Sequence, residues 1–161
     1  PHSGDGWAAG PSGIRVWGKF GAAGLFLVAG REVLLQHRAA WTNNGNTWGI
    51  PGGARDLQES PTQAALRETH EECAIAPADV EVLETQVTAG PYPPAGDLPG
   101  EWTYTTVLAR TRSGLRLPTT ANEESHELRW VGLDEVEKLP LIAPFRHAFP
   151  ALRRRVEKLN R

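Results

Sequence analysis

The sequence predicts an α/β domain in which helices cover a β-sheet. β-prone runs at residues 22–29 and 102–109 indicate buried strands, residues 60–73 have a well-marked helix start, and residues 143–159 form a second helical region. Strands and helices mixed along one chain form such layers. The 161 residues are enough for a single domain with its own core, and there is no internal repeat.

The first half of the chain is expected to supply most of the sheet. Residues 1–13 are rich in Gly, Ser and Pro and are expected to form a flexible lead, so that the folded domain spans residues 14–161. A short strand is expected at residues 14–17. The runs 22–29 and 32–37 are then predicted to pair through a tight hairpin at Gly30-Arg31. A polar stretch leads to Gly52-Gly53, where backbone can approach an ion closely.

The best-defined element is the helix that follows Ser60. Ser60 is suited to the N-cap and Pro61 to the first helical position, and Gln63 completes a capping box. Pro77 disfavours helical geometry at Ala76, so the helix should end before it. At about 100° per residue, one side carries small and apolar residues and another side carries acids. These two sets are Ala65, Leu66, Thr69 and Cys73, and Glu68, Glu71 and Glu72.

The three acids are unfavourably placed for a helix without a ligand. Glu68 has like-charge neighbours at Glu71 and Glu72, and each pair costs about 0.2–0.5 kcal/mol. Glu71 and Glu72 also lie in the last turn, where the helix dipole disfavours an anion by about 0.3–1 kcal/mol. A solvated charged face is the usual explanation of such a run. Here the free-energy cost of placing three acids together favours instead a site for a divalent cation such as Mg²⁺, which prefers carboxylate oxygens. The three acids are expected to be directed away from the packed side of the helix.

The second half of the chain is expected to complete the sheet. Strands are predicted at residues 80–87, 102–109 and 128–131. The intervening residues 88–101 contain four prolines and three glycines and form a loop long enough to suggest a functional role. Asp134 is expected to cap a short helix, and the terminal helix is expected to break or kink near Pro150.

Composition excludes several classes of protein. A net charge of −2 argues against binding long nucleic acids, so the arginines at 153–155 are interpreted as a solvated face. One cysteine cannot form an internal disulfide, which is consistent with a reducing, cytoplasmic compartment. No apolar run approaches the roughly 20 residues needed to span a bilayer, and no signal peptide is visible. Nothing in the sequence predicts an oligomeric state.

Gly53, Glu59 and the segment 67–72 together resemble the Nudix box of the Nudix hydrolases. The spacing is met at every charged position, and residues 48–53 and 127–136 look like those of actinobacterial MutT-like members. Two positions differ. Thr69 stands where an aliphatic residue is usual and is expected to pack by its methyl or to bond back into the preceding turn. Ala74 replaces a glycine that would supply a left-handed helix end, so a different exit is expected.

The resemblance implies an α/β/α sandwich around a mixed, partly curled sheet, over roughly residues 18–153. It also implies an enzyme that uses Mg²⁺, with Mn²⁺ as an alternative, to cleave a phosphoanhydride. The favoured substrate is a (deoxy)nucleoside triphosphate such as an oxidised guanine nucleotide. The alternatives are ADP-ribose, a nucleotide-sugar or a dinucleoside polyphosphate. A non-catalytic nucleotide-binding module is a further alternative, against which the intact acids count.

The resemblance also assigns roles within the Nudix box. Glu68 and Glu72 are expected to be the principal metal ligands, together with the backbone carbonyl of Gly53. Glu71 is expected to bind metal or to steer water. Arg67 should orient the carboxylates, supported by Glu59.

Residues outside the Nudix box complete the expected site. By the same resemblance, Arg38 is expected to contact phosphate, with a surface arginine at a strand end as the alternative. Glu124 is the expected fourth acidic ligand and Glu127 the reserve, while a simple charged turn is the alternative for both. His126 is expected to be an exposed histidine rather than a proton acceptor.

The nucleobase is expected to stack on an aromatic side chain. The candidates are Trp41, Tyr92 and Trp102, against the general expectation that large aromatics belong to the core. Pro91 and Tyr92 lie where the alternative subfamilies carry a proline or tyrosine, so this feature does not separate the substrate classes.

Overall fold

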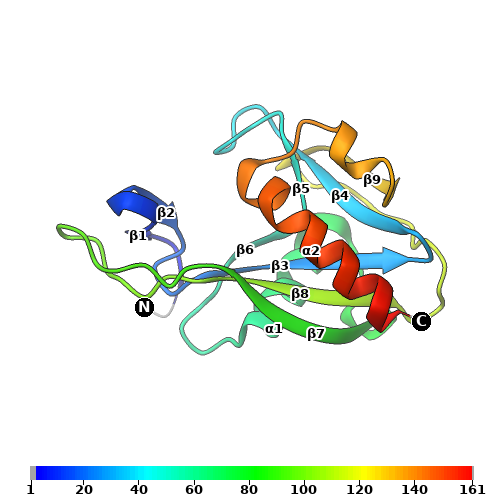
Figure 1. The fold of residues 1–161 in the computed structure, drawn as a ribbon, viewed down its shortest axis with the longest axis horizontal. Helices are drawn as coiled ribbons and strands as arrows, with labels where there is room; N and C mark the ends of the chain where they lie inside the picture. The colour runs from blue at the N-terminus through cyan, green and yellow to red at the C-terminus, as the bar shows by residue number, and fades with distance from the viewer. Residues whose placement is uncertain (1–2, 161) are drawn as a thin grey trace.

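The structure is a computed structural model that describes residues 3–160. A mixed β-sheet lies between two helices, α1 (Pro61–Cys73) on one face and α2 (Ala143–Leu159) on the other (Figure 1). This arrangement confirms the predicted α/β/α sandwich. No helix in the described part of the chain is long and apolar enough to cross a membrane.

The main sheet has seven strands. Five follow the order β5-β4-β3-β8-β7, while β6 pairs with β3 and β9 pairs with β4. β3 and β8 are parallel and the other pairs are antiparallel. The bounds are β3 (Ala22–Ala29), β4 (Glu32–Arg38), β5 (Trp48–Gly49), β6 (Gly52–Ala54), β7 (Val80–Ala89), β8 (Tyr104–Thr111) and β9 (Ser125–Gly132). The strands predicted in the main sheet are present with slightly shifted ends, whereas β5 and β6 were not predicted.

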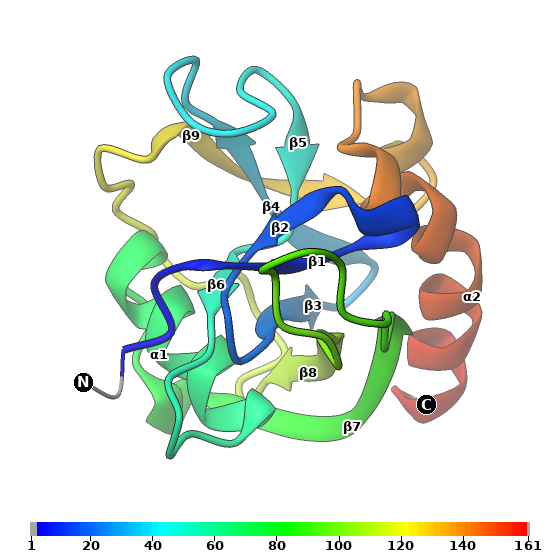
Figure 2. The same ribbon diagram turned by 90° about the vertical axis from the view of Figure 1, so that its left-hand side faces the viewer.

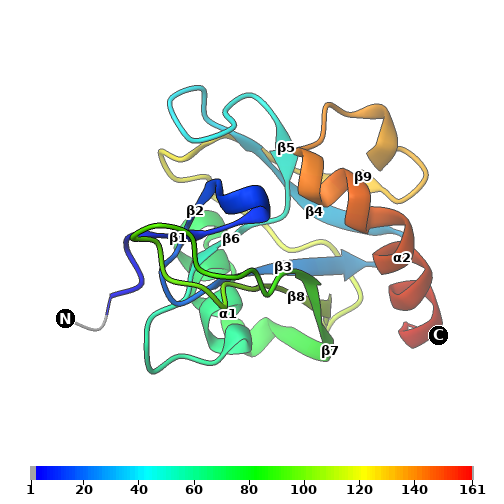
Figure 3. The ribbon, with the colours of Figure 1, turned by 60° about the vertical axis from the view of Figure 1, so that its left-hand side comes forward.

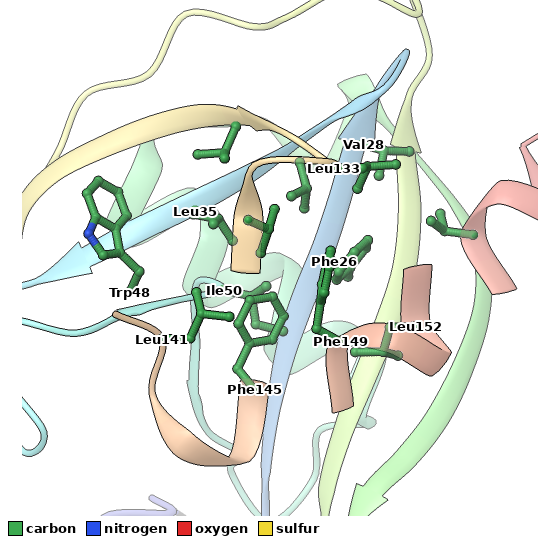
Figure 4. Close-up of a cluster of buried hydrophobic side chains, with 14 of the residues drawn as sticks. Phe26, Val28, Leu35, Trp48, Ile50, Leu133, Leu141, Phe145, Phe149 and Leu152 are labelled. Atoms are coloured by element: carbon green, nitrogen blue, oxygen red, sulfur yellow. The ribbon is translucent and has the colours of Figure 1, made fainter. Parts of the chain in front are cut away.

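Strand β3 lies at the centre of the sheet, and both of its faces are buried. Leu25 and Leu27 point to the α1 side, and Phe26 and Val28 point to the α2 side. Figure 4 shows Phe26 in the cluster that also contains Phe145, Phe149 and Leu152 of α2.

Strands β3 and β4 diverge after their hairpin. Their paired residues are confined to Val28, Ala29, Glu32 and Val33 next to the turn. The start of β3 pairs instead with β6, which places Gly52 and Gly53 beside Gly24 and Ala23. The side chain of Glu72, from the last turn of α1, reaches the gap between β4 and β6 and accepts a hydrogen bond from each strand.

Two expectations about the C-terminal region are wrong. Helix α2 does not break at Pro150 but continues through it, and the burial of Phe149 and Leu152 on either side stabilises it despite the missing N–H. Asp134 caps no helix, because residues Val136–Lys138 form a 3₁₀ turn without a side-chain cap. Its carboxylate pairs with Arg153 instead.

The N-terminal segment is packed against the domain rather than loosely attached as expected. Within it, β1 (Trp7–Ala9) pairs with β2 (Arg15–Trp17) in a separate two-stranded sheet, and Ala8 is fully buried. The Ala9 N–H donates to the Pro99 carbonyl at 2.9 Å, so this hairpin lies alongside the loop that follows β7 (Figure 2). In Figure 3 the hairpin lies toward the end of the molecule that is opposite the C-terminus of α2. Residues 1 and 2 of the expected lead lie outside the described residues.

Candidate active site

Helix α1 is held at both ends by local backbone chemistry. The predicted capping box is confirmed, because the Gln63 N–H donates to Ser60 Oγ at 3.1 Å and the Ser60 N–H donates to Gln63 Oε1 at 2.8 Å. The expectation of a different helix exit is wrong. Ala74 itself takes the left-handed conformation (φ 61°, ψ 34°) that glycine adopts more readily. Thr69 bonds back to the Ala65 carbonyl at 2.8 Å, as one of the two expectations proposed.

The carboxylate of Glu72 is buried inside the domain. Its residue is only 3% exposed, so the expectation that all three acids face away from the packed side is wrong at this position. Its Oε1 accepts from the Gly52 N–H at 2.9 Å, and its Oε2 accepts from Gln36 Nε2 at 3.3 Å. The carboxylate fits there because the gap between β4 and β6 presents hydrogen-bond donors to it.

The carboxylate of Glu68 lies directly over Gly53. A Cβ atom at Gly53 would lie 2.7 Å from Glu68 Cδ, so any side chain there would displace the carboxylate. The close approach that a glycine pair permits therefore brings together two of the expected metal ligands.

Arg67 joins the glycine loop to the helix. Its guanidinium donates to both oxygens of Glu59, at 2.6 and 2.8 Å, and to the Ala54 carbonyl at 3.1 Å. It also donates to Glu68 at 2.9 Å and, more distantly, to Glu71 at 3.5 Å. Glu71 is the most exposed of the three helix acids, with 56% of its side chain accessible.

Glu124 lies close to the acids of α1, whereas Glu127 does not contact them. Burial is the main cause of the raised pKa of Glu68 and of Glu72, and the negative charge of Glu124 contributes to both. Glu127 is paired with Arg129 at 3.0 Å and is half exposed. Of the two candidates for a fourth acid, Glu124 is therefore the one that the fold brings to the helix.

The electrostatics of this cluster disfavour ionised carboxylates in the absence of a cation. Burial, followed by the charges of Glu68 and Glu124, raises the pKa of Glu72 well above its usual range. Burial also raises the pKa of Glu68, although Arg67 partly opposes the effect. A divalent cation reverses this balance because it favours the charged form of its ligands.

The oxygen donors suit a hard cation. As the side chains lie, no group of three or more His, Cys, Asp or Glu residues within 3–160 is close enough to hold an ion directly. Glu68 is turned toward Arg67, and Glu72 is turned toward Gly52 and Gln36. The buried carboxylate of Glu72 and the half-buried carboxylate of Glu68 repel each other, and they fit a divalent ion better than they fit solvent.

Arg38 lies at the edge of the acidic cluster. It is the last residue of β4, and its guanidinium donates to the Asn43 carbonyl at 2.8 Å. The pKa of the Tyr104 hydroxyl is raised by burial and by the Glu72 charge and is lowered by Arg38. Tyr104 therefore lies within electrostatic range of both groups. Its position here was not predicted.

The three aromatic candidates lie in different environments. Trp41 is 68% exposed, in the loop after Arg38. Trp102 is only 9% exposed, donates from Nε1 to the Trp17 carbonyl, and stacks against Tyr92 with ring centroids 6.0 Å apart. Trp102 is therefore covered by the protein, and Tyr92 is half-buried beside it. Stacking of a nucleobase on any of the three rings stays a prediction.

His126 is exposed as expected, but it also makes a contact that was not predicted. Its Nε2 accepts from the Ala40 N–H at 2.9 Å, which anchors the loop that carries Trp41.

Gln36 and Ser125 are residues of this site that the sequence analysis missed. Gln36 is buried and donates to both Glu72 and Ser125. The sequence offered no clear signal for Gln36, because it stands between the apolar residues and the polar end of β4.

An α/β/α sandwich whose acidic helix is fastened to a glycine loop by one arginine defines the class of this protein. The family described as NUDIX domain matches residues 18–152, and the chain belongs to this family. It is therefore a pyrophosphohydrolase, of a family that generally uses divalent metals.

Relatives with defined names are similar over nearly the whole chain. A protein of Mycobacterium tuberculosis named "Putative 8-oxo-dGTP diphosphatase 3" is 48% identical over 155 residues, which cover 93% of this chain and 69% of that protein. A nucleoside triphosphate pyrophosphatase/Nudix hydrolase fusion protein of Bifidobacterium longum is 40% identical over 97% of this chain and 32% of its own length. The crystal structure of RenU, a Nudix hydrolase from M. smegmatis, matches with a TM-score of 0.88 and 44% identity over 97% of both chains.

Proposed function

We propose that this enzyme hydrolyses the phosphoanhydride of a (deoxy)nucleoside triphosphate, with an oxidised guanine nucleotide such as 8-oxo-dGTP as the preferred substrate. One observation carries the proposal: the carboxylate of Glu68 lies beside the backbone of Gly53, and the charges of Glu68 and Glu124 act on the buried carboxylate of Glu72. The name of the mycobacterial relative supports the choice of substrate.

In this proposal Glu68, Glu72, Glu124 and the Gly53 carbonyl hold the metal, and Glu71 either joins them or orients the attacking water. Mg²⁺ is the expected ion because the donors are oxygens, and Mn²⁺ should substitute for it. When bound, the ion neutralises phosphate charge and lowers the pKa of the attacking water.

The remaining residues position the substrate and the ligands. Arg67 keeps Glu68 over the glycine loop through its fork with Glu59. Arg38 is proposed to bind a phosphate of the substrate. Its guanidinium donates to the Asn43 carbonyl, and exchanging this contact for a phosphate oxygen would give a stronger, charge-assisted hydrogen bond. Trp41 is the aromatic candidate left with an exposed ring that could stack on a base. The partner is thus a small nucleotide, and we place the enzyme in the cytoplasm with the nucleotide pool.

A substrate panel tests this proposal. The protein is incubated with 8-oxo-dGTP, dGTP, ADP-ribose and diadenosine tetraphosphate in Mg²⁺ or Mn²⁺, and the products are separated by ion-exchange chromatography. We expect 8-oxo-dGTP to give the nucleoside monophosphate and pyrophosphate, and Glu72→Gln to abolish the turnover. Turnover of ADP-ribose without any triphosphate would contradict the substrate, and no turnover of any compound would favour a binding module.

A further inference from the structure

Gln36 is a fully buried polar side chain whose presence the core does not explain. It is 1% exposed, and it directly follows the buried apolar residues Val33, Leu34 and Leu35 of β4. Its Oε1 is buried without a hydrogen-bond partner among the described residues. A buried acceptor left unpaired costs about 1–3 kcal/mol, so packing alone would favour an apolar residue of similar size.

The amide of Gln36 bridges two elements that carry expected metal ligands. Its Nε2 donates to Glu72 Oε2 at 3.3 Å and to Ser125 Oγ at 2.7 Å. Glu72 belongs to the last turn of α1, and Ser125 begins β9 immediately after Glu124. One side chain therefore links the helix acid to the segment that supplies the fourth acid.

The backbone pairing at this end of β9 is irregular. The ladder between β4 and β9 changes register between His37 and Arg38, where His126 is left out of the pairing just after Glu124 and Ser125. The Ala39 N–H donates to the Glu124 carbonyl at 2.9 Å, and the Asn122 N–H reaches the Glu72 carbonyl at a long 3.4 Å. These bonds fix the main chain, whereas Gln36 also holds a carboxylate.

The Glu72 carboxylate is anchored through both of its oxygens. Gly52 holds Oε1 from the glycine loop and Gln36 holds Oε2 from β4. Because the two donors come from different strands, they fix the plane of the carboxylate and leave a lone pair on each oxygen for another partner.

We propose that Gln36 is a positioning residue, whose amide sets the separation of the Glu72 and Glu124 carboxylates so that both can bind one divalent-cation site. This inference deepens the proposed function and rests on it. Residues behind metal ligands act in this way, and their loss typically weakens metal binding by about 10–100-fold.

Gln36→Met tests the proposal because methionine keeps the length and approximate volume but removes the amide. The full chain is titrated with Mn²⁺ in the absence of nucleotide, with free Mn²⁺ followed by electron paramagnetic resonance. We expect the Kd for Mn²⁺ to rise about 10–100-fold, and kcat to fall with little change in KM. The Tm without metal should change little, because the removal of the unpaired acceptor is offset by the loss of the donor to Glu72 and Ser125.

Thr111→Val is the matched control. Thr111 Oγ1 is also buried without a partner among the described residues, but it lies at the opposite end of β8 from Tyr104. Its removal should leave the Kd for Mn²⁺ unchanged. Ser125→Ala and Ser125→Thr form a second pair, in which loss of the hydroxyl should weaken binding and threonine should restore it. If Gln36→Met does not fold, this pair of variants tests the positioning role instead.

Wild-type Mn²⁺ affinity in Gln36→Met or in Ser125→Ala would overturn the proposal. A lowered Tm with an unchanged Kd would likewise show a purely structural role. If no nucleotide is hydrolysed while Gln36→Met still weakens Mn²⁺ binding, the substrate assignment fails and the positioning role stands. If the wild type binds no Mn²⁺, both fail.

Discussion

Replacing Glu72 by glutamine should stabilise the metal-free protein while abolishing its activity. The side chain is almost completely buried, and both burial and the neighbouring acids raise its pKa. The metal-free fold must therefore either bury a charge or keep the carboxyl protonated at neutral pH. Glutamine has nearly the same shape and carries neither cost.

The size of the effect follows from the ordinary pKa of 4.5. Keeping a carboxyl protonated at pH 7 costs up to about 3 kcal/mol relative to the unfolded chain, since each pH unit is worth about 1.4 kcal/mol. Glu72→Gln should recover most of this, about 2 kcal/mol, which corresponds to about 4–8 °C in Tm for a chain of this size.

The same linkage predicts a pH dependence. The folded pKa of Glu72 lies above its unfolded value, so the folded state binds the extra proton. The associated stability is complete below about pH 4.5 and is lost as the pH rises toward the folded pKa. The metal-free wild type should therefore become less stable between pH 5 and 8 relative to Glu72→Gln.

Thermal unfolding followed by circular dichroism, with and without Mg²⁺, measures these effects. Saturating Mg²⁺ should raise the Tm of the wild type, by the equivalent of about 2.7 kcal/mol at a hundredfold excess over Kd, and should not raise that of Glu72→Gln. Glu71→Gln is the matched control, because its exposed side chain should change the metal-free Tm little. A metal-free Glu72→Gln that melts below the wild type would refute the reasoning.

Three further changes test other parts of the site. Glu124→Gln should lower kcat at least about tenfold, whereas Glu127→Gln should match the wild type; equal effects in steady-state assays would exclude Glu124 as the fourth acid. Arg67→Lys should lower both kcat and Tm because lysine cannot reproduce the fork to Glu59; full activity would show that the fork is dispensable. Ala74→Gly should raise the Tm by about 2–4 °C, because it relieves about 1 kcal/mol of left-handed strain; an unchanged melting curve would contradict this.

The helix and its boundaries could be predicted because they depend on neighbours in sequence. The capping box from Ser60 to Gln63 needs residues three apart, and the buried run of β3 is visible as consecutive apolar residues. The helix exit could not be predicted in the same way. Ala74 takes a left-handed conformation that alanine disfavours by itself, so the packing around it must impose that conformation.

The environment of each aromatic ring was beyond prediction from sequence. Trp102 and Trp41 are the same residue type and each is followed by a threonine in the sequence, yet Trp102 is covered by Tyr92 and Trp41 is exposed. The difference arises because β1 and β2 fold back onto the long loop after β7, a contact between segments about 90 residues apart in sequence.

The sequence by itself determined the family, the acidic helix and the longer strands of the main sheet, because these depend on local spacing and periodicity. Only the tertiary structure decided which acids meet. Glu68, Glu72 and Glu124 come together because β3 and β4 diverge and β9 pairs with β4, so the helix end and the start of β9 approach the same gap. The burial of Glu72 and its link through Gln36 to Ser125 follow from that approach, because a carboxylate enters a core only where the fold supplies donors to receive it.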